Sequence, residues 1–160
     1  MPLDRTDIAL LAALRKNART PNNVLADKAG VAPSTALERV RRLRADGVIL
    51  GYHAEIQPAA LGLALQAMID VRLARHALDA VSAFEQHLGT LREVLAWYHL
   101  AGATDYLIHA ALRDSAHLRT FVLDAIAARA EIAHIETHLI FSFRRNDALP
   151  LDEAKAAPST

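Results

Sequence analysis

The chain has 160 residues, of which 52% are hydrophobic and 22% are charged, so it can build one ordinary domain or two small ones. It contains no cysteine, which excludes disulfides and thiolate metal sites. No apolar run reaches the length of a membrane span, and the acidic, amphipathic start is unlike a signal peptide. We therefore expect a cytoplasmic protein without a membrane partner.

The charges are unevenly distributed, although the 18 basic and 18 acidic residues give a net charge of zero. Residues 1–52 contain nine basic and five acidic residues, whereas the remainder contains nine basic and thirteen acidic residues. A basic front part joined to an acidic rear part is typical of a DNA-contacting module attached to a module with another task. Because the basic excess is modest, several copies acting together are implied.

Two helices are predicted at the start of the chain. The first spans residues 4–16, and Asp4 or Thr6 can cap it. Its apolar residues recur at the spacing of one inward face: Ile8, Leu11 and Leu14. The second helix spans residues 22–29 and is followed by Gly30, which lets the backbone turn sharply.

A third helix, from Pro33 to Arg44, carries the features of a DNA-reading helix. Ser34 and Thr35 lie at its amino end, where hydroxyls and free backbone N–H groups can meet phosphates or base edges. Its predicted inward residues are Leu37, Val40 and Leu43. Four cationic side chains project elsewhere: Arg39, Arg41, Arg42 and Arg44. The glycine turn, the proline start, the hydroxyls and the arginines together favour a helix-turn-helix that binds double-stranded DNA.

Two structural interpretations compete with parts of this picture. The arginines of the third helix can form a solvated helix face without any partner, which is the usual role of a charge run. Thr35 and Glu38 have the spacing of a capping box, which would make Glu38 purely structural.

The chain is predicted to divide after the third helix. Residues 48–56 are expected to be extended, and breaks at residues 57–58 and 61–62 mark a boundary. We therefore predict a helix-turn-helix domain with a linker strand over residues 1–56 and a second domain over residues 62–143. Residues 144–160 form a polar tail to which we assign no role.

The second half alternates strands and helices in the order β-α-β-β-α-β, that of a ferredoxin-like domain. Ser115 is the expected cap of the second helix. The first predicted helix of this half spans residues 79–88, and its apolar residues Val81, Phe84 and Leu88 lie on one side. The predicted strands span residues 65–73, 94–100, 106–112 and 132–143. The predicted fold class is α+β, with a winged helix-turn-helix domain followed by this ferredoxin-like domain.

Both helices of such a domain cover one side of the sheet, so the other side is expected to meet a second copy of the chain. A twofold dimer would present two DNA-reading helices to successive major grooves. In the final strand, the residues expected to face the helices are Ala133, Ile135, Thr137, Leu139, Phe141 and Phe143. The opposite side would carry His134, Glu136, His138 and Ile140.

The histidines leave further alternatives open. His134, Glu136 and His138 can act as ligands of a divalent ion, or form a hydrogen-bonded interface whose titration near pH 6.5 loosens assembly. His99, His109 and Asp105 can in principle supply a catalytic base. No serine or cysteine lies beside a plausible base and no glycine-rich phosphate loop is present, so we expect neither an enzyme nor a metal or other cofactor.

Three segments resemble the Lrp/AsnC family of feast/famine regulators: residues 3–8, residues 37–43 followed by 47–49, and residues 102–107. The resemblance extends from Leu3 to about Phe143. It implies a transcriptional regulator with an amino-terminal helix-turn-helix and a ferredoxin-like domain that pairs subunits. It also implies assembly of dimers into larger rings, often octamers, with small effectors, typically amino acids, between dimers.

The resemblance implies an effector site at the residues Gly102, Ala103, Thr104, Asp105, Tyr106 and Thr137. This chain departs from the family's Gly-Asp-x-Asp loop, because Ala103 stands where one carboxylate is expected. An amino acid's ammonium would still find Asp105, and its carboxylate can be held by backbone N–H groups near Gly102. Ile135 stands in place of one of two alternate threonines, which favours an apolar effector.

Three alternatives remain at this stage. The loop can be a plain hairpin turn in which Asp105 is only a turn acceptor. Tyr106 can be a core residue, since its strand is apolar. The whole protein can be an architectural DNA-binding protein without any effector.

Overall fold

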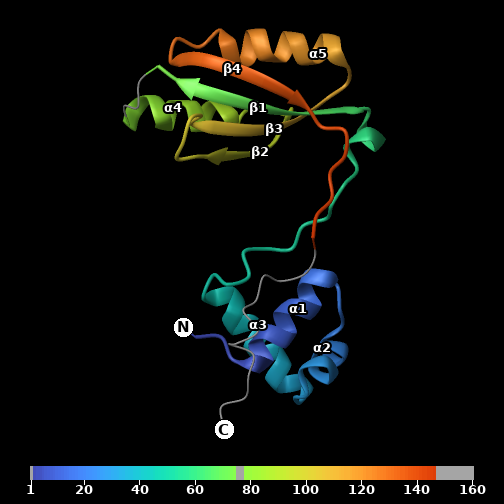
Figure 1. The fold of residues 1–160 in the computed structure, drawn as a ribbon. Helices are drawn as coiled ribbons and strands as arrows, with labels where there is room; N and C mark the ends of the chain where they lie inside the picture. The colour runs from blue at the N-terminus through green and yellow to red at the C-terminus, as the bar shows by residue number, and fades with distance from the viewer. Residues whose placement is uncertain (1, 75–77, 147–160) are drawn as a thin grey trace. The chain divides into compact units, whose positions relative to one another are not determined.

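The computed structural model describes residues 2–74 and 78–146, which form two compact units (Figure 1). The three N-terminal helices belong to the first unit, and the second unit is Ile56–Phe143. Residues 144–146 associate with the first unit, where the Arg15 guanidinium donates to the carbonyl oxygen of Asn146 at 2.8 Å. The rest of the predicted tail lies outside the described residues. Within the described part, no helix has the length and apolarity needed to cross a bilayer.

The first unit consists of α1 (Arg5–Lys16), α2 (Asn22–Ala29) and α3 (Pro33–Ala45). Asp4 caps α1 as predicted, since its carboxylate accepts from the Asp7 N–H at 2.8 Å. The Asp7 carboxylate in turn accepts from the Asp4 N–H at 3.3 Å, which completes a capping box. Gly30 ends α2 in the left-handed conformation with φ +66°, as the predicted turn requires.

The inward faces of α1 and α3 are rotated from the predicted ones. In α1, Ile8 and Leu11 are only half-buried. In α3 the buried residues are Ala36 and Leu43, so the predicted inward position of Leu43 is confirmed, whereas Leu37 is 40% exposed. The reason is that the small Ala36 side chain lets α3 pack closely, so the face toward the other helices passes through Ala36 and Leu43. The core cluster of this unit comprises Leu10, Ala13, Leu14, Leu25, Ala26 and Ala36.

The start of α3 also corrects a prediction. The helix begins at Pro33 with Ala32 as its N-cap, and no side chain caps it. Thr35 therefore lies inside the first turn, where it cannot act as the N-cap of a capping box with Glu38. Asn22 ties this start to α2 instead, because its side-chain amide donates to the Pro33 carbonyl at 2.7 Å.

The segment after α3 was predicted to be a strand, and this is wrong within this chain. Residues 50–57 contain no helix or strand, and a short 3-10 helix, η1 (Pro58–Leu61), follows. An extended segment becomes a strand only when a neighbour satisfies its backbone groups. No described segment of this chain pairs with it, and Leu50 is 94% exposed.

The second unit is an antiparallel sheet in the order β2-β3-β1-β4 with helices on one face (Figure 1). Its strands are β1 (Leu65–Leu73), β2 (Val94–His99), β3 (Tyr106–Leu112) and β4 (Ile132–Leu139). Its helices are α4 (Leu78–Leu88) and α5 (Ser115–Thr120), which continues as the π-helical η2 (Phe121–Ala127). The predicted β-α-β-β-α-β order is confirmed. The N-cap of α5 is Asp114 rather than Ser115, because the Asp114 carboxylate accepts from the His117 N–H at 2.8 Å.

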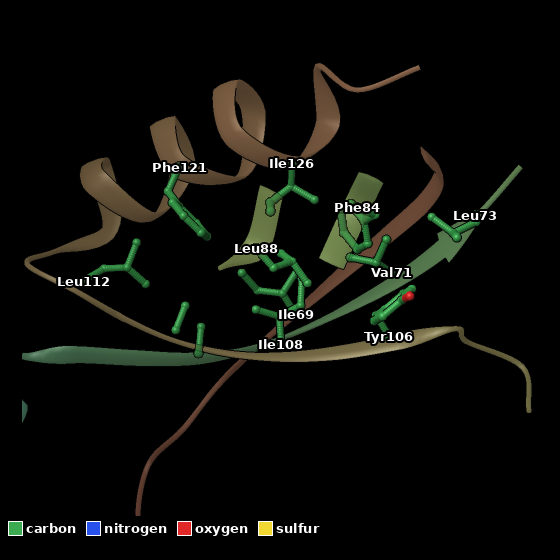
Figure 2. Packing of buried hydrophobic residues seen from close by; sticks show 12 residues of the cluster. Ile69, Val71, Leu73, Phe84, Leu88, Tyr106, Ile108, Leu112, Phe121 and Ile126 are labelled. Atoms are coloured by element: carbon green, nitrogen blue, oxygen red, sulfur yellow. The ribbon is translucent and has the colours of Figure 1, made fainter. Parts of the chain in front are cut away.

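The core of this unit lies between the sheet and the helices (Figure 2). The helices contribute Phe84 and Leu88 from α4 and Phe121 and Ile126 from η2, and the predicted inward position of Val81 is confirmed by its packing on this cluster. Alternate residues of the central strands supply the opposing layer: Ala67, Ile69, Val71 and Leu73 from β1, and Tyr106, Ile108, Ala110 and Leu112 from β3.

Strand β4 is shorter than predicted. It ends at Leu139, and Phe141 and Phe143 are 98% and 55% exposed, so they do not cover the helices as expected. The last contact with β1 is the bond from the Ile140 N–H to the Gln66 carbonyl, since β1 begins at Leu65 and offers no further partner. Ile135 packs on the core as predicted. At the start of β4, however, Ile132 rather than Ala133 lies opposite Leu73 and packs there, because the register with β1 shifts between Arg72 and Leu73.

Candidate nucleic-acid interface and effector site

The face of α3 that points away from the other helices is available for contact. Ser34 and Arg41 are exposed and Thr35 is half-buried, while Ala36 and Leu43 on the opposite side are buried. The amino end of α3 therefore offers a hydroxyl and unpaired backbone N–H groups to an anion such as a phosphate.

Asp7 is 1% exposed and holds two of the predicted DNA-contacting arginines. The Arg42 guanidinium donates to both Asp7 oxygens at 2.9 Å, and Arg39 donates to Asp7 at 3.1 Å. Arg39 also pairs with Asp4, and this hydrogen bond lowers the pKa of Asp4 and raises that of Arg39. Arg39 and Arg42 therefore hold α3 against α1 through their bonds to Asp7. The sequence had predicted that both side chains project freely.

Arg41 and Arg44 are the arginines of α3 that remain presented outward. Both are exposed, and the ion pairs found among residues 2–74 and 78–146 involve neither. The Arg44 guanidinium lies over the Tyr52 ring, 5.6 Å from its centroid. Together with Ile49, Arg41 and Arg44 also line a surface hollow of about 390 Å³. The two guanidiniums make this hollow suitable for a run of phosphates.

The loop between β2 and β3 presents its predicted effector residues unequally. Gly102 and Ala103 are exposed and Thr104 is half-buried, whereas Asp105 is only 8% exposed. The Asp105 carboxylate accepts from the Leu73 N–H at 2.7 Å. Asp105 therefore fastens this loop to the end of β1.

Tyr106 lies in the hydrophobic core, in line with the core alternative. Its hydroxyl donates to Glu85 at 3.1 Å, and its ring stacks on His99 at 4.6 Å between centroids. Burial, followed by the hydrogen bond to Glu85, raises the pKa of Tyr106 to about 12. Tyr106 consequently anchors the loop at residues 102–105 from inside the domain.

Thr137 is exposed on β4, opposite Ile69 and therefore on the helix-covered side of the sheet. It lines a hollow of about 430 Å³ together with Ser115, Leu118, Arg119, Val122 and Leu123. Because β1 separates β3 from β4, the structure does not bring Thr137 next to the loop at residues 102–105 within one chain.

The uncovered face of the sheet carries His109, His134 and His138. The His138 imidazole lies 3.1 Å from the Asp70 carboxylate and 3.8 Å from Glu136, as their shared face predicts. His109 bonds to Gln66 at 2.9 Å, and burial lowers its pKa. In the part of the chain that the structure describes, no three histidines or carboxylates gather as a metal site would require.

His99 and His109 do not form a catalytic pair. His99 stacks on the buried Tyr106 at the helix side of the sheet, whereas His109 lies opposite Met68 on the uncovered side. The sheet therefore separates the two imidazoles.

Sequence reasoning missed Asp7 as an organiser of the interface. The available signal was the pair of arginines at i and i+3 in α3, whose charge a buried acid of the preceding helix can balance. Helix periodicity alone places an acidic side chain toward solvent, so the sequence pattern does not identify Asp7 as buried.

Comparison with known proteins agrees with this geometry. Residues 66–147 match the Lrp/AsnC ligand binding domain, and residues 3–49 match the winged helix-turn-helix DNA-binding domain. The regulator AldR of Mycobacterium tuberculosis is 46% identical over 146 residues, which cover 91% of this chain and 82% of that protein.

Solved structures are similar as well. A transcriptional regulator of Neisseria meningitidis in complex with L-Met has a TM-score of 0.86 and 32% identity, covering 96% of this chain and 99% of that one. AsnC of Escherichia coli has a TM-score of 0.79 and 29% identity, covering 92% and 100%. These relatives are transcriptional regulators and not enzymes. The chain belongs to the Lrp/AsnC family of transcriptional regulators, with a DNA-binding helix-turn-helix and a ligand-binding domain.

Proposed function

We propose that this chain binds specific DNA sequences as a homo-oligomer and that a small effector, an amino acid, modulates its assembly or DNA binding. The proposed DNA binding rests on the arrangement of α3. Its outward side exposes Ser34 and Arg41, while Arg42 ties the helix to Asp7 of α1. We assign direct DNA contacts to Ser34, Thr35, Arg41 and Arg44. Arg39 and Arg42 orient α3 through Asp7 and add positive potential near the phosphates.

A salt titration tests the DNA contact. Arg41→Ala should weaken binding to all duplexes about equally and reduce the slope of log affinity against log salt by about one, because one phosphate contact is lost. Fluorescence anisotropy with a labelled duplex at several salt concentrations measures both quantities. Arg92→Ala, an exposed arginine of the second unit, is the control. Equal slopes for Arg41→Ala and the wild type would contradict this assignment.

The effector assignment rests on the loop at residues 102–105 and on Thr137. Since these elements are separated by β1 within one chain, we place the effector where the loop of one subunit approaches another subunit. The hollow beside Thr137 supports an apolar amino acid, because it combines Leu118 and Val122 with Arg119, whose guanidinium suits a carboxylate. The L-Met bound to the Neisseria meningitidis relative supports the same class of ligand.

Thermal melting against the twenty amino acids tests the effector. A ligand that binds the folded protein raises the melting temperature, and an excess of 100 times Kd stabilises by about 2.7 kcal/mol. Thr137→Val should reduce the rise because it replaces the hydroxyl with a methyl group, whereas Thr120→Val on α5 should not. If no amino acid changes the melting temperature, the second candidate function, an architectural DNA-binding protein, takes the place of effector control.

Assembly is proposed to begin on the uncovered face of the sheet. One face is covered by helices (Figure 1). The other face carries His109, His138 and Leu107, as their register with β1 shows. An isologous pair of sheets would bury this face. A larger assembly of dimers, an octamer, is the state that we propose for the complete regulator.

A further inference from the structure

Glu38 occupies an outward position on the DNA-reading helix. It is the one acidic residue of α3, and it shares the exposed side with Ser34 and Arg41 at spacings of four and three residues. The buried Ala36 and Leu43 point to the other side of the helix. Glu38 therefore lies in the middle of the surface proposed to enter the major groove.

The local structure leaves the Glu38 carboxylate without a structural task. Thr35 is not an N-cap, so the predicted capping box does not form. Arg42 has the i+4 spacing for an ion pair with Glu38 but donates to both oxygens of Asp7 instead. Among the described residues, no hydrogen bond or ion pair involves Glu38. Its carboxylate is presented outward, beside a hollow of about 380 Å³ that it lines with Thr35, Arg39 and Arg42.

An unpaired carboxylate on a DNA-binding surface has a defined chemical consequence. It is repelled by phosphates, so it weakens binding unless it accepts a hydrogen bond in the groove. Cytosine presents an N4 amino group there, which a carboxylate can accept from. Adenine also presents an amino group, but the N7 acceptor beside it repels a carboxylate. Guanine and thymine present only acceptors at the corresponding positions, so neither can donate to a carboxylate.

We propose that Glu38 selects cytosine at one position of the DNA site by accepting a hydrogen bond from its N4 amino group. This inference rests on the proposed sequence-specific binding of DNA through α3. The ion pair between Arg42 and Asp7 supports this proposal indirectly. Because Arg42 is paired with Asp7, it does not neutralise Glu38 within the helix.

Selection from a pool of duplexes with a randomised core tests the proposal. The wild type should enrich a motif containing a cytosine whose replacement lowers affinity about tenfold. Glu38→Ala should bind without preference at that position. Glu38→Gln should shift the preference toward adenine, because an amide can donate to N7 while accepting from N6. Both variants should retain the preferences at the other positions.

Asp27→Asn is the matched control, since it removes one exposed carboxylate of the same unit from α2. It should leave every base preference unchanged, although the loss of a negative charge strengthens binding to all duplexes. Retention of the full cytosine preference in Glu38→Ala would overturn the role of Glu38 and leave sequence-specific binding intact. A wild type that enriches no sequence would overturn sequence-specific binding itself, and this inference with it.

Discussion

At the scale of single residues, Asp7 determines how the DNA-binding unit is organised. A carboxylate that is 1% exposed is stable only when it is hydrogen-bonded, and here two guanidiniums and the Asp4 N–H supply the bonds. Two positive side chains that would repel each other on one helix face are thereby held together. Arg39 and Arg42 serve the orientation of α3 before they serve any contact with DNA.

Asp7→Ala should lower the free energy of unfolding of the first unit by about 2 kcal/mol. The value is below that of a fully buried pair because the arginine side chains remain 26% and 41% exposed. Urea denaturation followed by circular dichroism measures the change. Asp27→Ala removes an exposed acid from α2 and should leave stability almost unchanged. Equal stabilities of the two variants would contradict the role given to Asp7.

At the scale of elements, α4 shows how one helix covers the sheet. Its end residue Leu88 is fully buried against β1 and β3 residues of the core, while Leu78 at its start is 85% exposed. The helix and the sheet exclude water from one continuous cluster (Figure 2). Hydrophobic burial at the carboxyl end of α4 thus holds the helix on the sheet.

Leu88→Ala should destabilise the second unit by about 2–5 kcal/mol, because it leaves a cavity in a close-packed core. Leu78→Ala makes the same chemical change on the same helix at an exposed position and should cost less than about 0.5 kcal/mol. Thermal melting of the two variants separates the values. A similar loss in both would show that the packing described for α4 is wrong.

At the scale of the whole molecule, the sheet has one face covered by helices and one face on which we propose that a second copy packs. Leu107 on β3 lies on the uncovered face, opposite Asp70 and Tyr98. Asp70 and Glu136 already place two carboxylates beside His138 there. In the proposed isologous pair, a further negative charge on this face would be buried at the interface.

Leu107→Asp should lower the assembled mass in sedimentation velocity, because it adds unpaired charge to the proposed interface. Leu78→Asp, at the exposed start of α4, introduces the same charge on the helix-covered side and should leave pairing of the sheets intact. Circular dichroism should show folded protein in both variants. An unchanged mass for Leu107→Asp would remove this face as the site of pairing.

The sequence by itself determined the element order, because periodicity of apolar residues is local. The limits of β1 and β3, the turn at Gly30 and the cap at Asp4 follow from residues within a few positions of each other. The resemblance to a known family and the basic first part likewise needed only the chain. The sequence therefore predicts that α3 carries the candidate DNA-reading surface.

Only the tertiary structure decided what each side chain does within these elements. It placed Ala36 rather than Leu37 inward, engaged Arg42 with Asp7, and enclosed Tyr106 in the core. It also ended β4 at Leu139, where β1 no longer offers a partner. The physical reason is that packing, ion pairing and strand pairing depend on residues that are distant in the chain, whereas helix and strand patterns depend on neighbours.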